Sequence, residues 1–283
     1  DIKLDSIEQS SDSKLGLGND AQNTNEIENE SCLTYVRTPI LGASNDEPVL
    51  RADQTQNGNT VQAIMNAIVA CSNSGGGTVY LNGGTYTGSG TLRANQGQLL
   101  NIHDVKVVGG SRTNPDQKAT LQGSLEFRGY GQDIPGVQVE IFPGFFRPVE
   151  GFYSNSGVNL TNVTFENLIG TGSMFAFKSG SLTDCVFNNL ESYNHLFFVY
   201  GSFFDNAPIP MTNCNFTNCH QTYPGENGVA DGSGQLGAVF GAKMVGCNFI
   251  NTSSANHGGA FCLSDNSEWG TQRVASSLID CNF

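Results

Sequence analysis

The sequence predicts an all-β protein, built as a parallel solenoid with one short helix near its N-terminal end. Three observations predict this class. A short pattern, seen as LTNVTFENL at 160–168 and LTDCVFNNL at 182–190, returns along the C-terminal half. Its apolar positions keep their spacing while extra residues enter only at particular turns, and only one substantial stretch has helical periodicity. Apolar positions of constant spacing, joined by loops of variable length, are typical of stacked repeats.

The composition narrows the classes of function. The chain has 283 residues, a formal net charge of −13 and only 14% charged residues. A chain of this length buries a large core without a metal or a disulfide. The negative charge argues against a nucleic-acid partner, because phosphate binding needs a basic face. No apolar run has the length of a membrane helix, so no membrane insertion is expected in this segment.

Residues 1–31 form a polar, acidic segment that we expect to be disordered on its own. They hold eight Asp or Glu against Lys3 and Lys14, with no aromatic residue. The first seven residues, DIKLDSI, alternate apolar and polar, so they can add a strand where a sheet edge is offered. The chain begins at Asp1 without a Met, as a processed exported protein or an excised piece would. Residues 32–283 are expected to form a single domain.

The one helix is predicted at about residues 59–71, where it caps the solenoid. Its apolar residues recur at helical spacing, and Asn59 or Thr60 is available as the N-cap. These apolar residues are Val61, Ile64, Met65, Ile68 and Val69. The following run, GGGTVYLNGGTYTGSGTL at 75–92, predicts two short strands between glycine turns.

The regular repeat occupies about residues 158–283 and is anchored on one phenylalanine in each copy. Two residues before the anchor stands Val or Cys, and two residues after it stands Asn. The three columns are Phe165, Phe187, Phe216, Phe249 and Phe283; Val163, Cys185, Cys214, Cys247 and Cys281; and Asn167, Asn189, Asn218 and Asn251. A degenerate earlier copy offers Ile102, Val105 and Val107. A second strand follows eleven residues after three of the anchors, at Ala176, Phe198 and Ala260.

The columns predict where their side chains lie. Residues two apart on a strand share a face, so the Cys and Phe columns point the same way. Successive turns in register would stack the rings inside about 4.8 Å apart. The Asn column predicts a corner, because Asn tolerates the left-handed backbone and can bond the Asn of the next turn.

The cysteines leave two alternatives open. Neighbouring cysteines of the column would have Cα atoms at a separation that a disulfide can span. Aligned side chains, however, do not easily reach the dihedral angle that a disulfide requires. Free, buried thiols that act as small apolar groups are favoured. Cys32 with Cys71 is a separate candidate pair near the cap. No spacing of Cys and His predicts a zinc site.

These residues resemble a known group of proteins. The run at 75–92, the repeated L-T-x-C-x-F-x-N and HGGAF at 257–261 are similar to the adhesin-like surface proteins of methanogenic archaea, over about residues 48–283. The F-x-N and GGA pieces are similar, less completely, to repeats of chlamydial polymorphic outer-membrane proteins. The resemblance implies a right-handed parallel β-helix of the pectin-lyase-like type. It also implies an extracellular, cell-envelope-associated protein for attachment, with no catalytic residues to carry over.

A carbohydrate-active enzyme on the same fold is the competing class. Such an enzyme needs carboxylates that face one sugar, or a calcium cluster with an Arg or Lys base. The one mixed region holds Lys118, Arg128, Arg147, Asp116, Glu126, Asp133 and Glu140. Its turn-rich sequence favours a surface loop. His257 is similar to a piece of polygalacturonases, whose other catalytic partners are missing here, so we expect a turn histidine. No catalytic residue, metal or cofactor is predicted.

The stretch IFPGFFRPVEGFY at 141–153 is the most aromatic of the chain. Exposed, it would be a contact for a glycan or a protein. A loop packed on the flank of the solenoid is favoured.

We expect a non-enzymatic surface adhesin or scaffold, whose partner is a cell-surface glycan or protein, or further copies of the chain. The repeat stops at Phe283 in the middle of a unit, so more turns are expected beyond it. The alternative is that another chain covers this end, in a filament whose subunits donate the N-terminal strand to a neighbour.

Overall fold

The computed structural model describes residues 33–35, 60–81, 83–114, 116–142, 144–202, 204–224, 237–255, 259–260, 262–263 and 276–283. The acidic segment 1–31, Cys32 and His257 lie outside the described residues, so the predictions made for them stay predictions.

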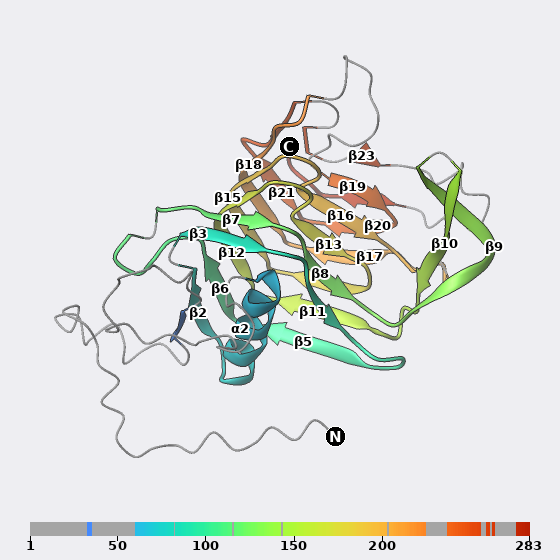
Figure 1. Ribbon diagram of the computed structural model, residues 1–283, viewed down its shortest axis with the longest axis horizontal. Helices are drawn as coiled ribbons and strands as arrows, with labels where there is room; N and C mark the ends of the chain where they lie inside the picture. Colours follow the sequence, from blue (N-terminus) through green and yellow to red (C-terminus); the bar gives the residue numbers. More distant parts are fainter. Residues whose placement is uncertain are drawn as a thin grey trace.

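The described residues are mostly strands, arranged in three parallel sheets with a single helix (Figure 1), which confirms the all-β class. Sheet A contains β1 (Leu33–Tyr35), β2 (Gly77–Tyr80), β3 (Gly84–Thr87), β6 (Val105–Val108), β7 (Ala119–Gln122), β12 (Thr164–Gly170), β15 (Val186–Ser192), β18 (Asn215–Gln221), β21 (Asn248–Ile250) and β22 (Ser253–Ser254). Sheet B contains β4 (Gly90–Arg93), β8 (Leu125–Arg128), β13 (Phe175–Phe177), β16 (Phe197–Tyr200), β19 (Gly237–Phe240) and β23 (Cys262–Leu263). Sheet C contains β5 (Leu99–His103), β11 (Gly157–Thr161), β14 (Gly180–Thr183), β17 (Ile209–Thr212), β20 (Ala242–Val245) and β24 (Ser277–Ile279).

The chain visits the sheets in the constant order A, B, C, and each such passage is called a rung below. Strands β12, β13 and β14 form one rung, and β15, β16 and β17 form the next. The register between these two rungs pairs Phe165 with Phe187 and Leu182 with Met211. The degenerate early copy keeps the same register, since Val107 pairs with Phe165. Like residues of the repeat therefore lie side by side.

Helix α2 (Val61–Asn73) packs against β2 and β4 at the N-terminal end of the stack (Figure 1). It begins after Thr60, whose hydroxyl accepts a hydrogen bond from the Ala63 backbone N–H at 3.2 Å. Ile64 and Ile68 are fully buried because they share the face that meets the strands. The predicted helix is present, with both ends two residues later than the predicted 59–71, and of the two candidate N-caps the helix uses Thr60.

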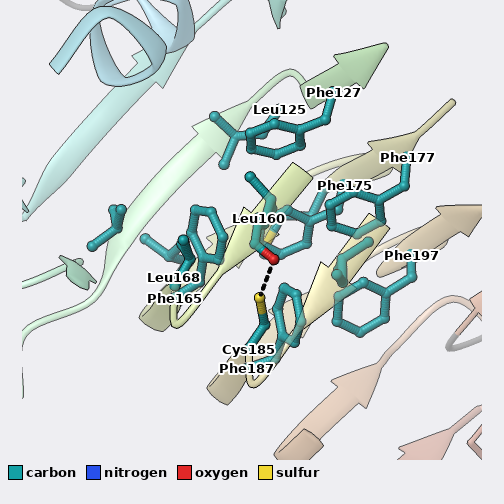
Figure 2. Packing of buried hydrophobic residues seen from close by; sticks show 14 of the residues in the cluster. Leu125, Phe127, Leu160, Phe165, Leu168, Phe175, Phe177, Cys185, Phe187 and Phe197 are labelled. Carbon is teal, nitrogen blue, oxygen red and sulfur yellow. Dashed lines mark hydrogen bonds between the residues drawn. The ribbon is translucent and has the colours of Figure 1, made fainter. Parts of the chain in front are cut away.

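The core contains columns of phenylalanine rings from sheets A and B that face each other (Figure 2), together with aliphatic, Met and Cys side chains. In the sheet A column, the ring centroids of Phe187 and Phe216 are 5.0 Å apart and those of Phe216 and Phe249 are 4.8 Å apart. In the sheet B column, Phe197 packs edge-on against Phe187, with 4.8 Å between centroids. Stacked and edge-to-face rings are the favoured aromatic geometries, and full burial contributes roughly 1.5–3 kcal/mol for each ring.

Left-handed residues bend the chain at two places in every regular rung, and the first of these places lies within the sheet A strands β12, β15 and β18. The Asn column has positive φ throughout, and Asn189 Nδ2 donates to Asn167 Oδ1 at 2.6 Å. Glycine replaces Asn in the early copy, because a Cβ on Gly109 would lie 1.7 Å from the Asn167 carbonyl oxygen. A second column was missed, although Asn, Asp or Gly always stands three residues before the anchor. It comprises Asp104, Asn162, Asp184, Asn213, Gly246 and Asp280, with φ between 50° and 65°.

Two predictions about strands need correction. Cys262, not Ala260, pairs with Ala238 in sheet B, so the strand of that rung begins two residues later than the spacing predicted. The turn-rich region 116–147 is not an ordinary surface loop, because it contains β7, β8 and most of an antiparallel hairpin. Short strands separated by Gly and Asp resemble turns in sequence, and pairing with neighbouring rungs makes them strands.

Candidate functional site

An antiparallel hairpin, called the arm below, leaves the stack between β8 of sheet B and β11 of sheet C. It consists of β9 (Gly131–Phe142) and β10 (Phe145–Phe152), and it stands beside the parallel sheets in Figure 1. Register shifts interrupt the pairing near Phe145 and near Pro148. Pro148, which has no backbone N–H, is tolerated here because the outer edge of a two-stranded hairpin has no neighbouring strand to which that N–H would donate. The arm belongs to one rung alone, so it is no part of the repeat.

The tip of the arm exposes two neighbouring phenylalanines. The Phe145 side chain is 59% exposed and that of Phe146 is 57% exposed. The other end of the same aromatic stretch is buried, since Phe152 is only 2% exposed. The packed loop that we favoured is therefore wrong for the tip, where the exposed alternative holds, and right only for the base.

The base of the arm is fastened to the following rungs. The Phe152 ring packs edge-on against Tyr200 at 6.2 Å between centroids. The Ser202 hydroxyl donates to the Phe152 carbonyl, and the Ser154 backbone N–H donates to Asp205 Oδ2 at 2.6 Å. The Ser154 N–H and hydroxyl hold the pKa of Asp205 below its ordinary value. These contacts hold the start and end of the hairpin, and they leave its tip to project.

A row of half-buried rings continues the fastening along the corner between sheets B and C. Tyr130 stacks on Tyr153 at 5.8 Å, and Tyr153 stacks on Phe204 at 4.7 Å. The Arg93 guanidinium lies over the Tyr130 ring, 5.7 Å from its centroid. Each of these residues comes from a different segment of the stack or from the base of the arm, so the row ties them together.

A network of four charged residues, called the charged network below, lies between the outer face of sheet B and the arm. Arg128 of β8 forms an ion pair with Glu150 of β10 and lies 3.8 Å from the Glu126 carboxylate. Lys178 Nζ, from the next rung, lies 3.5 Å from the same carboxylate oxygen, Glu126 Oε2. The Arg128 guanidinium also covers the Phe152 ring, at 5.4 Å from its centroid.

The charged network is two carboxylates against two cations, all partly buried. Partial burial strengthens each ion pair relative to a surface pair. Among the buried side-chain N and O atoms of the described residues, Arg128 Nε is the one without a hydrogen-bond partner. Chemically, the carboxylates can accept hydrogen bonds from hydroxyl groups, and the cations can donate to hydroxyl or carboxylate oxygens.

The structure separates the residues of the mixed region named from the sequence. It brings Glu126 and Arg128 together, and it places Asp133 on β9 opposite Glu150. Asp116 and Lys118 precede β7 on sheet A instead. The side chains of Glu140 and Arg147 lie outside the described residues.

The sequence analysis missed Glu150 and Lys178. A signal for Lys178 exists, since Phe127 pairs with Phe177 and a cation follows each of them, in LEFR and in FAFK. Glu150 has no such signal, because it reaches Arg128 only through the fold of the arm.

Two other kinds of site are absent from the residues that the structure describes. No group of three or more His, Cys, Asp or Glu side chains there is placed to hold a metal ion. In the same part of the chain, no helix has the length and apolar character needed to cross a membrane.

Comparison with known proteins gives no relative. No family model matches the chain, and no curated protein or solved structure matches it either.

Proposed function

We propose that the chain is a non-enzymatic, extracellular adhesin or scaffold of the cell surface, built on a right-handed parallel β-helix of the pectin-lyase-like type. The constant order of the three parallel sheets supports the β-helix, and parallel crossovers are right-handed in about 98% of cases. The partner is a glycan or protein of a cell surface, or a further copy of the chain.

The exposed pair Phe145 and Phe146 carries this proposal. Soluble proteins expose single apolar residues freely, whereas two adjacent aromatic rings at a projecting tip mark a contact site. Aromatic side chains lose little conformational entropy on binding and are frequent energetic anchors of interfaces. The base of the arm is fixed by Phe152 and the Arg128–Glu150 ion pair, so the tip is presented by a firm support.

The test measures binding of the intact chain to a glycan array, to cell surfaces and to itself. The double variant Phe145→Ser/Phe146→Ser should weaken the strongest interaction at least about tenfold. Leu99→Ser is the matched control, because Leu99 is also half exposed but lies on β5 of sheet C. Equal losses in both variants, or no loss in either, would remove the arm from the proposal.

The charged network favours a second candidate, a polysaccharide lyase or glycoside hydrolase on the same fold. A carboxylate beside two cations is a suitable arrangement for proton transfer near an acidic sugar. A screen for unsaturated or reducing ends on acidic polysaccharides tests it, with Glu126→Gln and Asp133→Asn as variants. Turnover by the intact chain that either variant abolishes would replace the adhesin proposal.

A further inference from the structure

The N-terminal end of the stack presents the outermost strand of each parallel sheet. These strands are β1 of sheet A, β4 of sheet B and β5 of sheet C. The outer edge of such a strand carries backbone N–H and C=O groups that a strand of another molecule can pair with, unless something else covers them. Helix α2 crosses this end and contacts strands of all three sheets. Its polar side chains are therefore placed to close the open edges.

A side-chain amide of the helix closes the edge of sheet B. The Gly90 N–H of β4 donates to the Ser124 carbonyl, on the side of β8, and adjacent residues of a strand direct their backbone groups to opposite edges. Thr91 therefore faces the open edge, where its N–H donates to Gln62 Oε1 at 2.8 Å. Gln62 Nε2 donates back to the Thr91 carbonyl at 3.4 Å. Since a primary amide has the same donor and acceptor as a peptide group, Gln62 takes the place of a neighbouring strand.

The other two sheets are closed at the same end by different groups. In sheet C, the His103 N–H of β5 donates to the Ser72 hydroxyl at 3.0 Å, and Ser72 is a buried residue of the last helical turn. In sheet A, β1 pairs with β2, and the N-cap residue Thr60 forms a parallel bridge with Thr87 of β3. The first turn of α2 thus closes sheet B and the last turn closes sheet C, so one helix serves two sheets.

We propose that α2 terminates the stack, so that copies of the chain do not add strands to its N-terminal end, and that the Gln62 amide is the group that closes sheet B. A filament that grows by end-to-end stacking needs this end open, and the helix excludes that route. The inference rests on the proposed function in one respect. Where the partner is a further copy of the chain, that copy must bind elsewhere, as at the tip of the arm.

The helix supplies a matched control in Asn66. It lies one turn after Gln62 on the same exposed face, and its Oδ1 accepts a hydrogen bond from Gln62 Nε2 at 3.1 Å. Such a pair at i, i+4 supports the helix only slightly. Asn66→Ala therefore removes a polar side chain from the helix surface while the Gln62 amide still reaches Thr91. Alanine is also a better helix former than either residue, so neither substitution should melt the helix.

The experiment compares Gln62→Ala and Asn66→Ala with the intact wild-type chain by two measurements. Hydrogen exchange, taken relative to the intrinsic rate, reports the protection of the Thr91 amide, and light scattering over a range of concentrations reports the molar mass. In Gln62→Ala, the protection of Thr91 should fall at least about tenfold. The same variant should have a higher average mass than the wild type at equal concentration, because the edge of β4 is open. Asn66→Ala should match the wild type in both.

Each contrary result overturns a stated part of the proposal. Unchanged protection of Thr91 in Gln62→Ala would show that the amide does not close the strand. Lost protection with an unchanged mass would show that the closed edge does not prevent assembly, and equal association of both alanine variants would contradict the role of Gln62. Gln62→Glu keeps the acceptor for the Thr91 N–H, so it should keep the protection that the alanine variant loses. These results do not depend on whether the tip of the arm binds a partner, so the two proposals can fail separately.

Discussion

The inside and the outside of sheet B differ in what repeats. Inside, Phe175 and Phe197 of consecutive rungs pair in register, and their rings stack with 5.4 Å between centroids. Outside, the equivalent positions read Glu126, Ala176 and Phe198 in three successive rungs. The repeated side chains hold the rungs together, because each rung must present the same packing surface to the next rung. The unrepeated side chains are free to differ, and the charges of the network converge there.

The largest effect should follow a change to the inner column. Phe187→Ala removes a fully buried ring that contacts rings of two neighbouring rungs and of sheet B. We expect a loss of about 3–5 kcal/mol in the free energy of unfolding, measured by denaturant titration. Phe198→Ala, on the outer face of sheet B, is the comparison and should cost clearly less. Similar losses would mean that the two faces do not differ as described.

A corner substitution should have the next largest effect. Asn189 has a φ of 51°, where a side chain with a Cβ is strained unless it bonds locally. Asn189→Ala should cost roughly 1–2 kcal/mol, because it keeps the strain and loses the bond to Asn167. Asn189→Gly should recover part of that loss, since glycine adopts this backbone freely. A glycine variant no more stable than the alanine variant would show that the amide bond alone matters.

The ion pair that fastens the arm should contribute less. A double-mutant cycle of Arg128→Met and Glu150→Gln should give a coupling free energy of about 1 kcal/mol. Lys106 and Glu166, a 2.8 Å pair on sheet A, form the matched control, because the Lys106 side chain is 48% exposed and that of Arg128 only 17%. The control pair should couple more weakly. The reverse order would remove the charged network as the fastening of the arm.

The smallest effect should be the pH dependence of the arm's base. The pKa of Asp205 lies below its ordinary 3.8 in the folded chain, chiefly because the Ser154 N–H donates to it. Its stabilising contribution is therefore complete above that ordinary value and is lost as the pH falls through the lower, folded pKa. The protection of the Ser154 amide against hydrogen exchange, taken relative to the intrinsic rate at each pH, should fall below pH 3.8 in the wild-type chain. In Asp205→Asn this acid-induced step should be absent, and its persistence would point to another group.

The repeat made most of the stack predictable, and the arm shows where prediction stops. The Phe, Cys and Asn columns could be aligned from spacing alone, because each rung repeats the same local sequence pattern and backbone geometry. The second left-handed column, Asp184 and its equivalents, was readable in the same way and was overlooked. The charged network was not readable, since Glu150 meets Arg128 only after a hairpin outside the repeat folds back. Local sequence does not encode such a long-range contact.

We propose that repeated residues hold the stack while the tip of the arm makes the contact with a partner. Binding affinity and free energy of unfolding, measured together on Phe145→Ser/Phe146→Ser, test it most directly. We expect a binding loss of at least about tenfold with stability within about 0.5 kcal/mol of wild type. Unchanged binding, or a large loss of stability in the variant, would contradict it.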